Sequence, residues 1–167
     1  MEGKNYINGA FVDGTSGDRF ESRNPANFDE ILGTFPLSSE QDVNNAVSAA
    51  KTAYDGWRRL SRIKRGEHFD EFVQLLKKDR EEISRLVTKE CGKGIVEGRA
   101  DVTEGIHMVQ YTFGTVRMPH GDVVDSEIPE KDAFMRRKPK GVVAAISPWN
   151  FPFAIPDRKS TRLNSSH

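Results

Sequence analysis

The sequence predicts an α/β fold that opens with short strands, continues through three amphipathic helices and reaches one buried strand of a sheet. Three observations predict it. An Asn-Gly pair lies between short apolar runs near residue 8, apolar residues recur at helical spacing between residues 38 and 116, and residues 142–146 are all apolar. The chain has 167 residues, which is room for about one domain with a hydrophobic core.

The N-terminal region is predicted to form short strands joined by tight turns. Asn8-Gly9 between apolar residues is a strong hairpin signal and predicts two strands within residues 6–12. Further strands are expected over residues 20–22 and 30–36. The turn between them is predicted at residues 24–27, because Pro restricts its own backbone and that of its predecessor.

Three helices follow, and each has an apolar stripe. The first begins at Ser38 with a capping box to Gln41, or at Ser39 with Asp42 as the alternative register. Its stripe consists of Val43, Ala46, Val47, Ala50, Tyr54 and Trp57. The second helix is expected over residues 64–90, with the buried stripe Phe69, Val73, Leu76, Ile83, Leu86 and Val87. Gly92 and Gly94 break it, and the third carries Val102, Ile106, Val109, Phe113 and Val116.

The region after the third helix changes from polar to apolar. Residues 122–129 are interpreted as a polar connection and residues 134–138 as an extended segment. The run Val142–Ile146 is typical of a central parallel strand that is buried on both faces. Two prolines in Ser147-Pro148-Trp149-Asn150-Phe151-Pro152 then predict a loop.

The loop after this strand is the best candidate for chemistry. In open α/β sheets, ligands bind beyond the carboxyl ends of the strands. The side-chain amide of Asn150 can donate hydrogen bonds to a developing oxyanion at such a position. The alternative is that Asn150 only stabilises its own turn by bonding to the backbone.

Composition and charge argue against several classes of function. The 25 Lys and Arg residues balance 25 Asp and Glu residues, so net charge indicates no nucleic-acid partner and no anionic membrane surface. No apolar run is long enough for a membrane helix. A single cysteine, Cys91, suits a reducing, cytoplasmic compartment. His68, His107 and His120 lack the spacing of metal ligands, so no metal site is predicted.

The last eleven residues, Asp157–His167, match codon by codon a translated DNA-sequencing adapter. We therefore expect the natural part of this sequence to end at Pro156, in the middle of a larger domain, and residues 157–167 to be a non-native tail. One buried parallel strand cannot cover its own faces, so the sheet is expected to be truncated.

The run Gly141–Pro152 closely resembles the first Rossmann strand and following loop of the aldehyde dehydrogenase superfamily. The resemblance extends over residues 6–156, through the Asn8-Gly9 hairpin, the Asn24-Pro25-Ala26 turn and the segment from Glu90 to Lys93 with Glu97. It implies the N-terminal part of a Rossmann-type NAD(P)-binding domain with a β-hairpin arm, an oligomerisation strand and three helices.

The implied activity is oxidation of an aldehyde, for example a semialdehyde, to a carboxylic acid with NAD or NADP. In that family a cysteine thiolate forms a thiohemiacetal, hydride leaves to the nicotinamide, and a glutamate activates water. When the site residues of that family are matched to this sequence, Asn150 resembles the side-chain donor of the oxyanion hole. Ile146, Ser147, Pro148 and Trp149 resemble the wall beside the cofactor.

The departures from the family pattern concern the nucleophile and base. Both are expected downstream of this segment, and Cys91 is no substitute because no neighbour suggests a lowered thiol pKa. The resemblance also implies a homodimer or homotetramer. Two alternatives remain open: a non-catalytic assembly module built on the same segment, and a related acyl-phosphate-reducing semialdehyde dehydrogenase of the same architecture.

Overall fold

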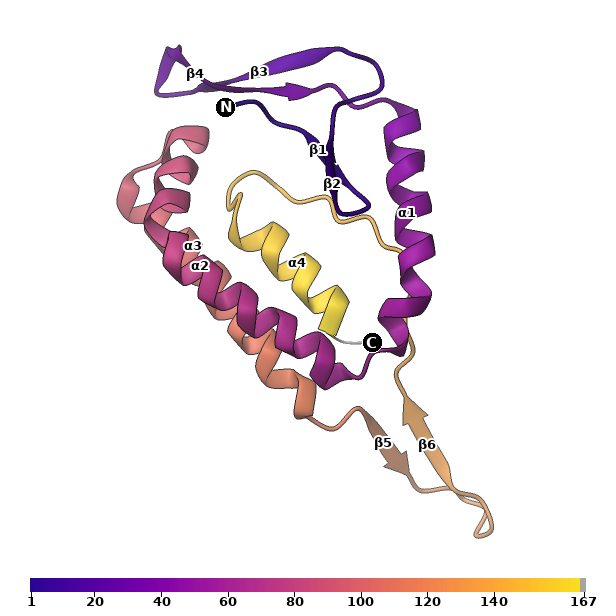
Figure 1. Cartoon of the computed structure of the whole chain (residues 1–167). Coiled ribbons are helices and arrows are strands. Elements are labelled where there is room, and N and C mark those ends of the chain that lie inside the picture. The colour runs from indigo at the N-terminus through magenta and orange to yellow at the C-terminus, as the bar shows by residue number, and fades with distance from the viewer. Residues whose placement is uncertain (166–167) are drawn as a thin grey trace.

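The structure is a computed structural model that describes residues 1–165 and the side chains of residues 1–160. Within this range the helices are α1 (Glu40–Arg59), α2 (Arg62–Cys91), α3 (Ile95–Gly114), the 3-10 turn η1 (Thr115–Arg117) and α4 (Ala154–Ser165). The strands are β1 (Asn5–Ile7), β2 (Ala10–Val12), β3 (Arg19–Asn24), β4 (Asn27–Pro36), β5 (Gly121–Val124) and β6 (Ala133–Arg136). They pair consecutively into three antiparallel two-stranded sheets (Figure 1).

The first hairpin, β1–β2, forms at the predicted Asn-Gly pair. Asn8 and Gly9 both have positive φ, 53° and 78°, as the favoured two-residue hairpin turn requires. Ile7 pairs with Ala10 across it. The prediction of this hairpin is confirmed, because the turn conformation depends almost wholly on these two adjacent residues.

The second hairpin, β3–β4, confirms the predicted strands and the Pro25 turn but is longer than expected. Its register shifts on both sides of Arg23, which marks a β-bulge. Two side-chain contacts tie the hairpin to the end of α2. Lys89 pairs with Glu30, and Ser22 Oγ donates to Glu90 Oε1 at 2.9 Å.

Helix α1 begins in the alternative register of the predicted capping box. The Ser39 side chain accepts from the Asp42 N–H, and the Asp42 carboxylate accepts from the Ser39 N–H. The Ser38–Gln41 register is therefore wrong. Asp42 also accepts from Thr15 N at 3.1 Å, and hydrogen bonds led by the Ser39 N–H lower the pKa of its carboxyl. The apolar stripe of α1 stays partly uncovered, with Val43 57% exposed.

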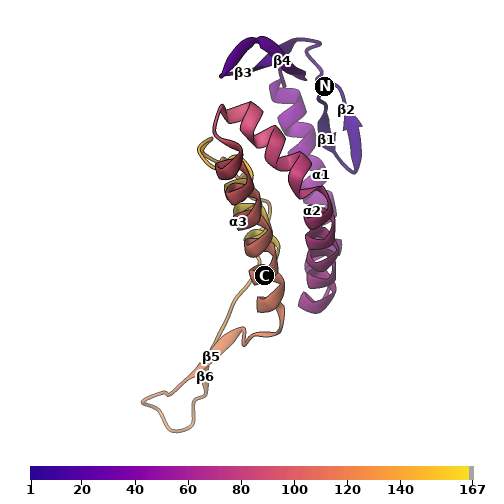
Figure 2. The same ribbon diagram turned by 90° about the vertical axis from the view of Figure 1, so that its left-hand side faces the viewer.

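Helices α2 and α3 pack against each other and make the core (Figure 2). Its buried members are Phe69, Val73, Leu76 and Val87 from α2 and Val102, Ile106 and Val109 from α3. The predicted stripes are confirmed at these positions. Leu86 and Phe113, which were predicted to be buried, are instead 40% and 38% exposed and lie outside the core cluster.

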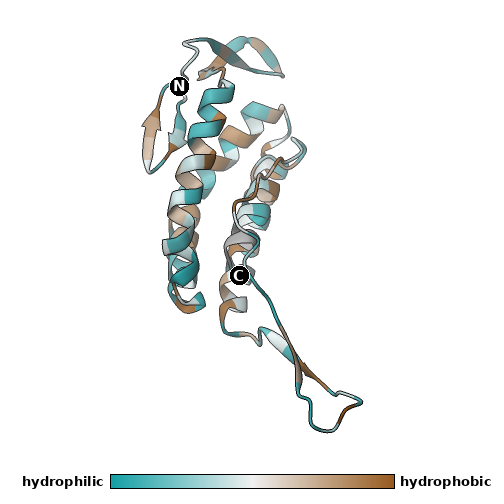
Figure 3. Cartoon of the chain, turned by 90° about the vertical axis from the view of Figure 1, so that its right-hand side faces the viewer, coloured by the Kyte–Doolittle hydropathy of each residue, from teal (hydrophilic) through white to brown (hydrophobic). Residues whose placement is uncertain are grey.

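The arm β5–β6 projects away from the helices (Figure 1). Figure 3 shows both hydrophobic and hydrophilic residues along this arm. Residues 122–124, interpreted from the sequence as part of a polar connection, belong to β5, which pairs with β6. The signal for this strand was the Val123-Val124 pair. Both valines are exposed, since no other element covers the arm.

The run Val142–Ile146 is not a buried strand, so this prediction is wrong for the described chain. Its five residues are exposed and have no strand partner. Apolar sequence alone does not make a strand, because the backbone needs a neighbouring strand to bond with. None of the elements within residues 1–165 lies alongside it in that role.

Helix α4 follows the predicted loop and packs along α3 (Figure 1). It runs from Ala154 to Ser165 and so includes most of the segment expected to be a non-native tail. Pro156 lies in its first turn, where a helix does not need the missing N–H.

Candidate functional site

The turn that carries Asn150 joins the exposed run 142–146 to helix α4. Pro148 and Pro152 flank it and prevent regular structure. The helix then starts with two backbone bonds, Ile155 N to Phe151 O and Asp157 N to Phe153 O, each 3.2 Å long. The predicted loop is therefore confirmed, and it places Asn150 four residues before α4 begins at Ala154.

The α2–α3 corner contacts this turn from one side. Lys93 Nζ donates to the backbone oxygen of Asn150 at 2.9 Å and lies 5.1 Å from the ring centroid of Phe151. The Cys91 thiol approaches the backbone oxygen of Trp149 at 3.8 Å. These contacts join parts of the chain that are 57 and 58 residues apart.

Helix α3 holds the other end of the turn. The carboxylate of Asp101, which is fully buried, accepts a hydrogen bond from Ala154 N at 2.9 Å. A Cβ on Gly105 would lie 2.5 Å from the ring of Phe153, so only glycine permits this close approach. The end of the turn is thus seated on α3 by one charged hydrogen bond and one tight contact.

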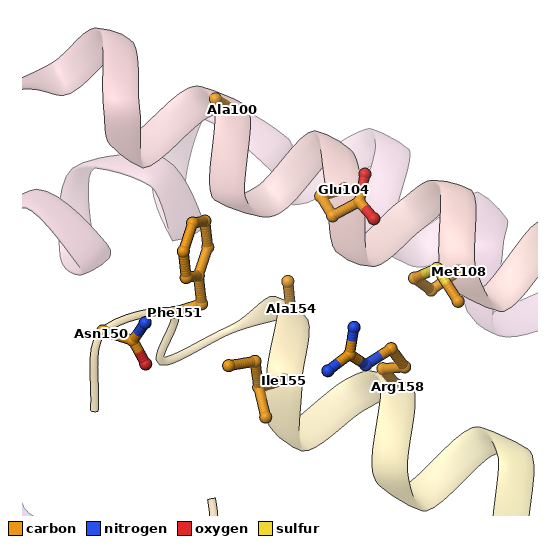
Figure 4. A pocket seen from close by; sticks show the side chains of 8 residues that line it. All are labelled: Ala100, Glu104, Met108, Asn150, Phe151, Ala154, Ile155 and Arg158. Carbon is orange, nitrogen blue, oxygen red and sulfur yellow. The ribbon is translucent and has the colours of Figure 1, made fainter. Parts of the chain in front are cut away.

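A cavity of about 570 Å³ lies between α3 and the turn with α4. Figure 4 shows its lining: Ala100, Glu104, Met108, Asn150, Phe151, Ala154, Ile155 and Arg158. Asn150 lies at one end, and Met108 and Arg158 lie at the other. The cavity is apolar along Ala154 and Ile155. Its polar lining groups are the Asn150 amide, the Glu104 carboxylate and the Arg158 guanidinium. Such a hollow with few polar groups is typical of small-molecule sites.

The five predicted site residues lie together on one segment but in different surroundings. Asn150 lines the cavity. Ile146 and Trp149 are 87% and 86% exposed, Pro148 is exposed, and Ser147 is half-buried. The Ile146 carbonyl oxygen accepts from Lys159 Nζ. Ile146–Trp149 thus form a surface beside the cavity, and the structure does not draw them into it.

Cys91 lies near the turn but is a poor nucleophile. Burial raises the pKa of its thiol, and the nearby Lys93 ammonium offsets only part of that rise. A neutral thiol reacts slowly with carbonyl groups. This agrees with the expectation that Cys91 does not replace the nucleophile of the family it resembles.

Sequence reasoning missed Lys93 and Asp101 as neighbours of Asn150. The signal for Asp101 was an acid directly before Val102 on a helix that packs against the core. The signal for Lys93 was its position in the glycine-rich helix break, Gly92-Lys93-Gly94. Neither signal identifies the partner, because both contacts are long-range.

Metal and membrane features are absent from the described part of the chain. Among residues 1–165 no cluster of three His, Cys, Asp or Glu side chains could hold a metal ion. None of the helices in the same range is long and apolar enough to span a membrane.

The sequence model of the aldehyde dehydrogenase family matches residues 11–162. The chain belongs to the aldehyde dehydrogenase family. The predicted resemblance is confirmed, and so is the α/β class with the N-terminal architecture of that family. The matched region continues past Pro156, and the adapter origin of residues 157–167 stays a prediction.

Curated relatives of this chain include semialdehyde dehydrogenases. An α-ketoglutaric semialdehyde dehydrogenase of Bacillus subtilis is 38% identical over 152 residues, which are 91% of this chain and 31% of that protein. A malonate-semialdehyde dehydrogenase of Lacticaseibacillus casei is 40% identical over 154 residues, which are 92% and 31%. The chain therefore spans about a third of the length of the curated relatives it matches.

Solved structures show the same relation. An NADP-dependent enzyme of E. coli superposes with a TM-score of 0.93 and 27% identity, covering 99% of this chain and 34% of that one. An NAD-dependent aldehyde dehydrogenase from Sinorhizobium meliloti gives a TM-score of 0.91 and 29% identity, with 99% and 34% coverage. The fold described here is thus that of the first third of such chains.

Proposed function

We propose that this chain is the N-terminal part of an NAD- or NADP-dependent aldehyde dehydrogenase, and that Asn150 donates a hydrogen bond to the aldehyde oxygen. One observation carries the proposal: the Asn150 side chain lines the cavity between α3 and the turn with α4. Attack on an aldehyde carbon places negative charge on its oxygen. A fixed amide N–H stabilises that charge, an effect of about 3 kcal/mol in related sites.

The nucleophile and the general base are assigned to the protein outside residues 1–167. The only cysteine in the chain is Cys91, and its raised pKa argues against it. The contribution of this chain is therefore to bind and orient the aldehyde. Ala154 and Ile155 support that role, since they offer the substrate an apolar surface in the cavity that Asn150 lines.

Residues Ile146, Ser147, Pro148 and Trp149 are proposed to line the cofactor site. The apolar side chains of Ile146, Pro148 and Trp149 are exposed and available to the ring of a cofactor, and the half-buried residue Ser147 adds a hydroxyl group beside them. When bound, the nicotinamide would accept hydride from the substrate carbon.

A semialdehyde is the proposed substrate class. Relatives at 38% and 40% identity are α-ketoglutaric and malonate-semialdehyde dehydrogenases by name.

The domain assignment, assembly and location are further parts of the proposal. Residues 1–156 would be the first part of an NAD(P)-binding domain, and residues 157–167 a non-native tail. The exposed edges of β5 and β6 suit pairing with a second subunit in a homodimer or homotetramer. The single free Cys91 suits a cytoplasmic location, and the balanced charge suits a protein without nucleic-acid or membrane partners.

The test is Asn150→Ala in the complete gene product. We expect kcat to fall about 10²- to 10³-fold, because one oxyanion donor is lost. Asn44→Ala, on the exposed surface of α1, is the matched control and should leave kcat unchanged. A normal kcat in the Asn150 variant would mean that this residue only shapes its turn, and the proposed role would be lost.

A further inference from the structure

The corner between α2 and α3 is a four-residue segment, Cys91 to Gly94, that lies against the Asn150 turn. Helix α2 ends at Cys91, and Gly92 adopts a left-handed conformation with φ 66°. This conformation reverses the chain and directs Lys93 toward the turn. The Lys93 side chain is half-buried, so its charge is less screened than that of a free surface lysine.

Two interactions of Lys93 converge on adjacent residues. Its ammonium donates to the Asn150 backbone oxygen at 2.9 Å and lies 5.1 Å from the ring centroid of Phe151. A hydrogen bond from a charged donor is stronger than a neutral one, and a cation over an aromatic face adds a second attraction. One side chain thus restrains both the carbonyl group of Asn150 and the residue that follows it.

The restraint matters because the other end of the turn is already held. Asp101 accepts a hydrogen bond from Ala154 N at 2.9 Å. The short segment from Asn150 to Ala154 is therefore held at its first residue by Lys93 and at its last residue by Asp101. Fixing the Asn150 carbonyl group fixes the peptide plane after its Cα. Because the allowed side-chain rotamers depend on the backbone conformation, the same contact restricts the directions that the Asn150 amide can take.

We infer that Lys93 is a positioning residue that orients Asn150 for its role as an oxyanion donor. The inference rests on the proposed function of Asn150. Lys93 does not line the cavity, so it acts only through the turn. Misplacement of a catalytic group by about 1 Å can cost about 10²-fold in rate, so the effect of losing this contact is measurable.

The experiment compares substitutions of Lys93 in the complete gene product. Lys93→Met keeps the length of the side chain but removes its charge and its donors. We expect kcat to fall about 10- to 100-fold while KM changes much less, because geometry at the carbonyl group is lost but the cavity is intact. Lys93→Arg should recover most of the rate. Lys51→Met, on the exposed surface of α1, is the matched control and should have no effect.

A double variant separates positioning from general structural damage. If Lys93 acts through Asn150, Lys93→Met combined with Asn150→Ala should be no slower than Asn150→Ala alone. Multiplicative losses in the double variant would overturn the inference. If Lys93→Met does not fold, Lys93→Gln, which retains a donor without charge, takes its place in the cycle, and an unchanged kcat would overturn the inference.

The two proposals can fail separately. A normal kcat in Asn150→Ala removes the proposed function of Asn150 and the inference with it. A large loss in Asn150→Ala with a normal kcat in Lys93→Met overturns only the positioning role of Lys93.

Discussion

The α2–α3 pair and the segment from β5 to Ile146 differ in the burial of their apolar residues: the helix pair buries them, and the segment exposes them. In the helix pair, Val102 and Val109 are fully buried, and Phe69 and Leu76 are nearly so. In the segment, Phe134 is 77% exposed and Ile146 is 87% exposed. Both regions are rich in apolar residues, so hydrophobicity alone does not distinguish them.

The difference lies in whether each region finds its partner within the described chain. An amphipathic helix buries its stripe against one other helix, and α2 and α3 supply each other. A strand of the apolar type needs neighbours on both edges and cover on both faces. Within residues 1–165 the arm has only its own hairpin, and residues 142–146 have no strand partner. Exposed apolar surface of this kind is typical of interaction sites.

The strongest way to break the comparison is a matched pair of phenylalanine substitutions. Phe69→Ala should lower the free energy of unfolding by about 3–5 kcal/mol, because it opens a cavity in the α2–α3 core. Phe134→Ala on β6 should change it by less than about 0.5 kcal/mol. Chemical denaturation monitored by circular dichroism measures both. Equal losses would show that the arm is packed in solution.

A second test asks whether α4 belongs to the packed region. Asp157 is 8% exposed, and burial raises the pKa of its carboxyl from 3.8 to about 7. Because the folded state binds this proton more tightly, the stability contribution of the group falls as pH rises from about 4 to about 7. Asp157→Ala should therefore stabilise the chain at pH 8 by at most about 4 kcal/mol, and by little at pH 4.

The control for this test is Asp70→Ala, at an exposed position on α2. Its stability difference should not follow pH in the same window. Should the Asp157 variant show the same gain at pH 4 and pH 8, the carboxyl would not be buried in solution, and α4 would not be docked on α3.

A third prediction concerns the capping box at the start of α1, a helix with little tertiary cover. Ser39→Ala should cost about 1 kcal/mol, because the Asp42 N–H loses its acceptor. Ser38→Ala, at the register rejected by the structure, should cost less, since its hydroxyl donates only to Asn5 Oδ1. Thermal melts of the two variants decide between the registers, and a larger loss at Ser38 would reverse the assignment.

The smallest effect is expected at the ion pair between α2 and α3. The hydrogen bond from Arg99 lowers the pKa of Glu81 to about 2. The contribution of the pair is present above the ordinary carboxyl pKa of 4.5 and is lost as pH falls toward 2. Both side chains are exposed, so Glu81→Gln should lower the melting temperature only slightly at pH 7 and not at pH 2. A pH-independent difference would argue against the pair.

The sequence predicted those elements whose signals are local. The Asn8-Gly9 turn, the helix break at Gly92 and the loop after Ser147 all formed where residue chemistry restricts the backbone. The two candidate caps of α1 could not be separated in advance, because Ser38 and Ser39 carry the same hydroxyl. The contact of Asp42 with Thr15 N favours the second register, and that contact crosses 27 residues.

The candidate site was predictable only as a segment. Pro148–Pro152 signalled a loop, and the family resemblance singled out Asn150 within it. Its neighbours Lys93 and Asp101 come from a helix corner and a helix interior more than 50 residues away. Periodicity identifies which face of a helix is apolar, but it does not say which loop will lie against that helix.

Turn types, helix ends and apolar stripes follow from the order of residues, because each depends on steric and hydrogen-bonding preferences within a few positions. Tertiary packing decided three other matters: which stripe is covered, that residues 142–146 remain unpaired, and that Lys93 and Asp101 meet the Asn150 turn. These depend on which distant surfaces are available to bury apolar area and satisfy backbone groups, and short-range preferences carry no information about them.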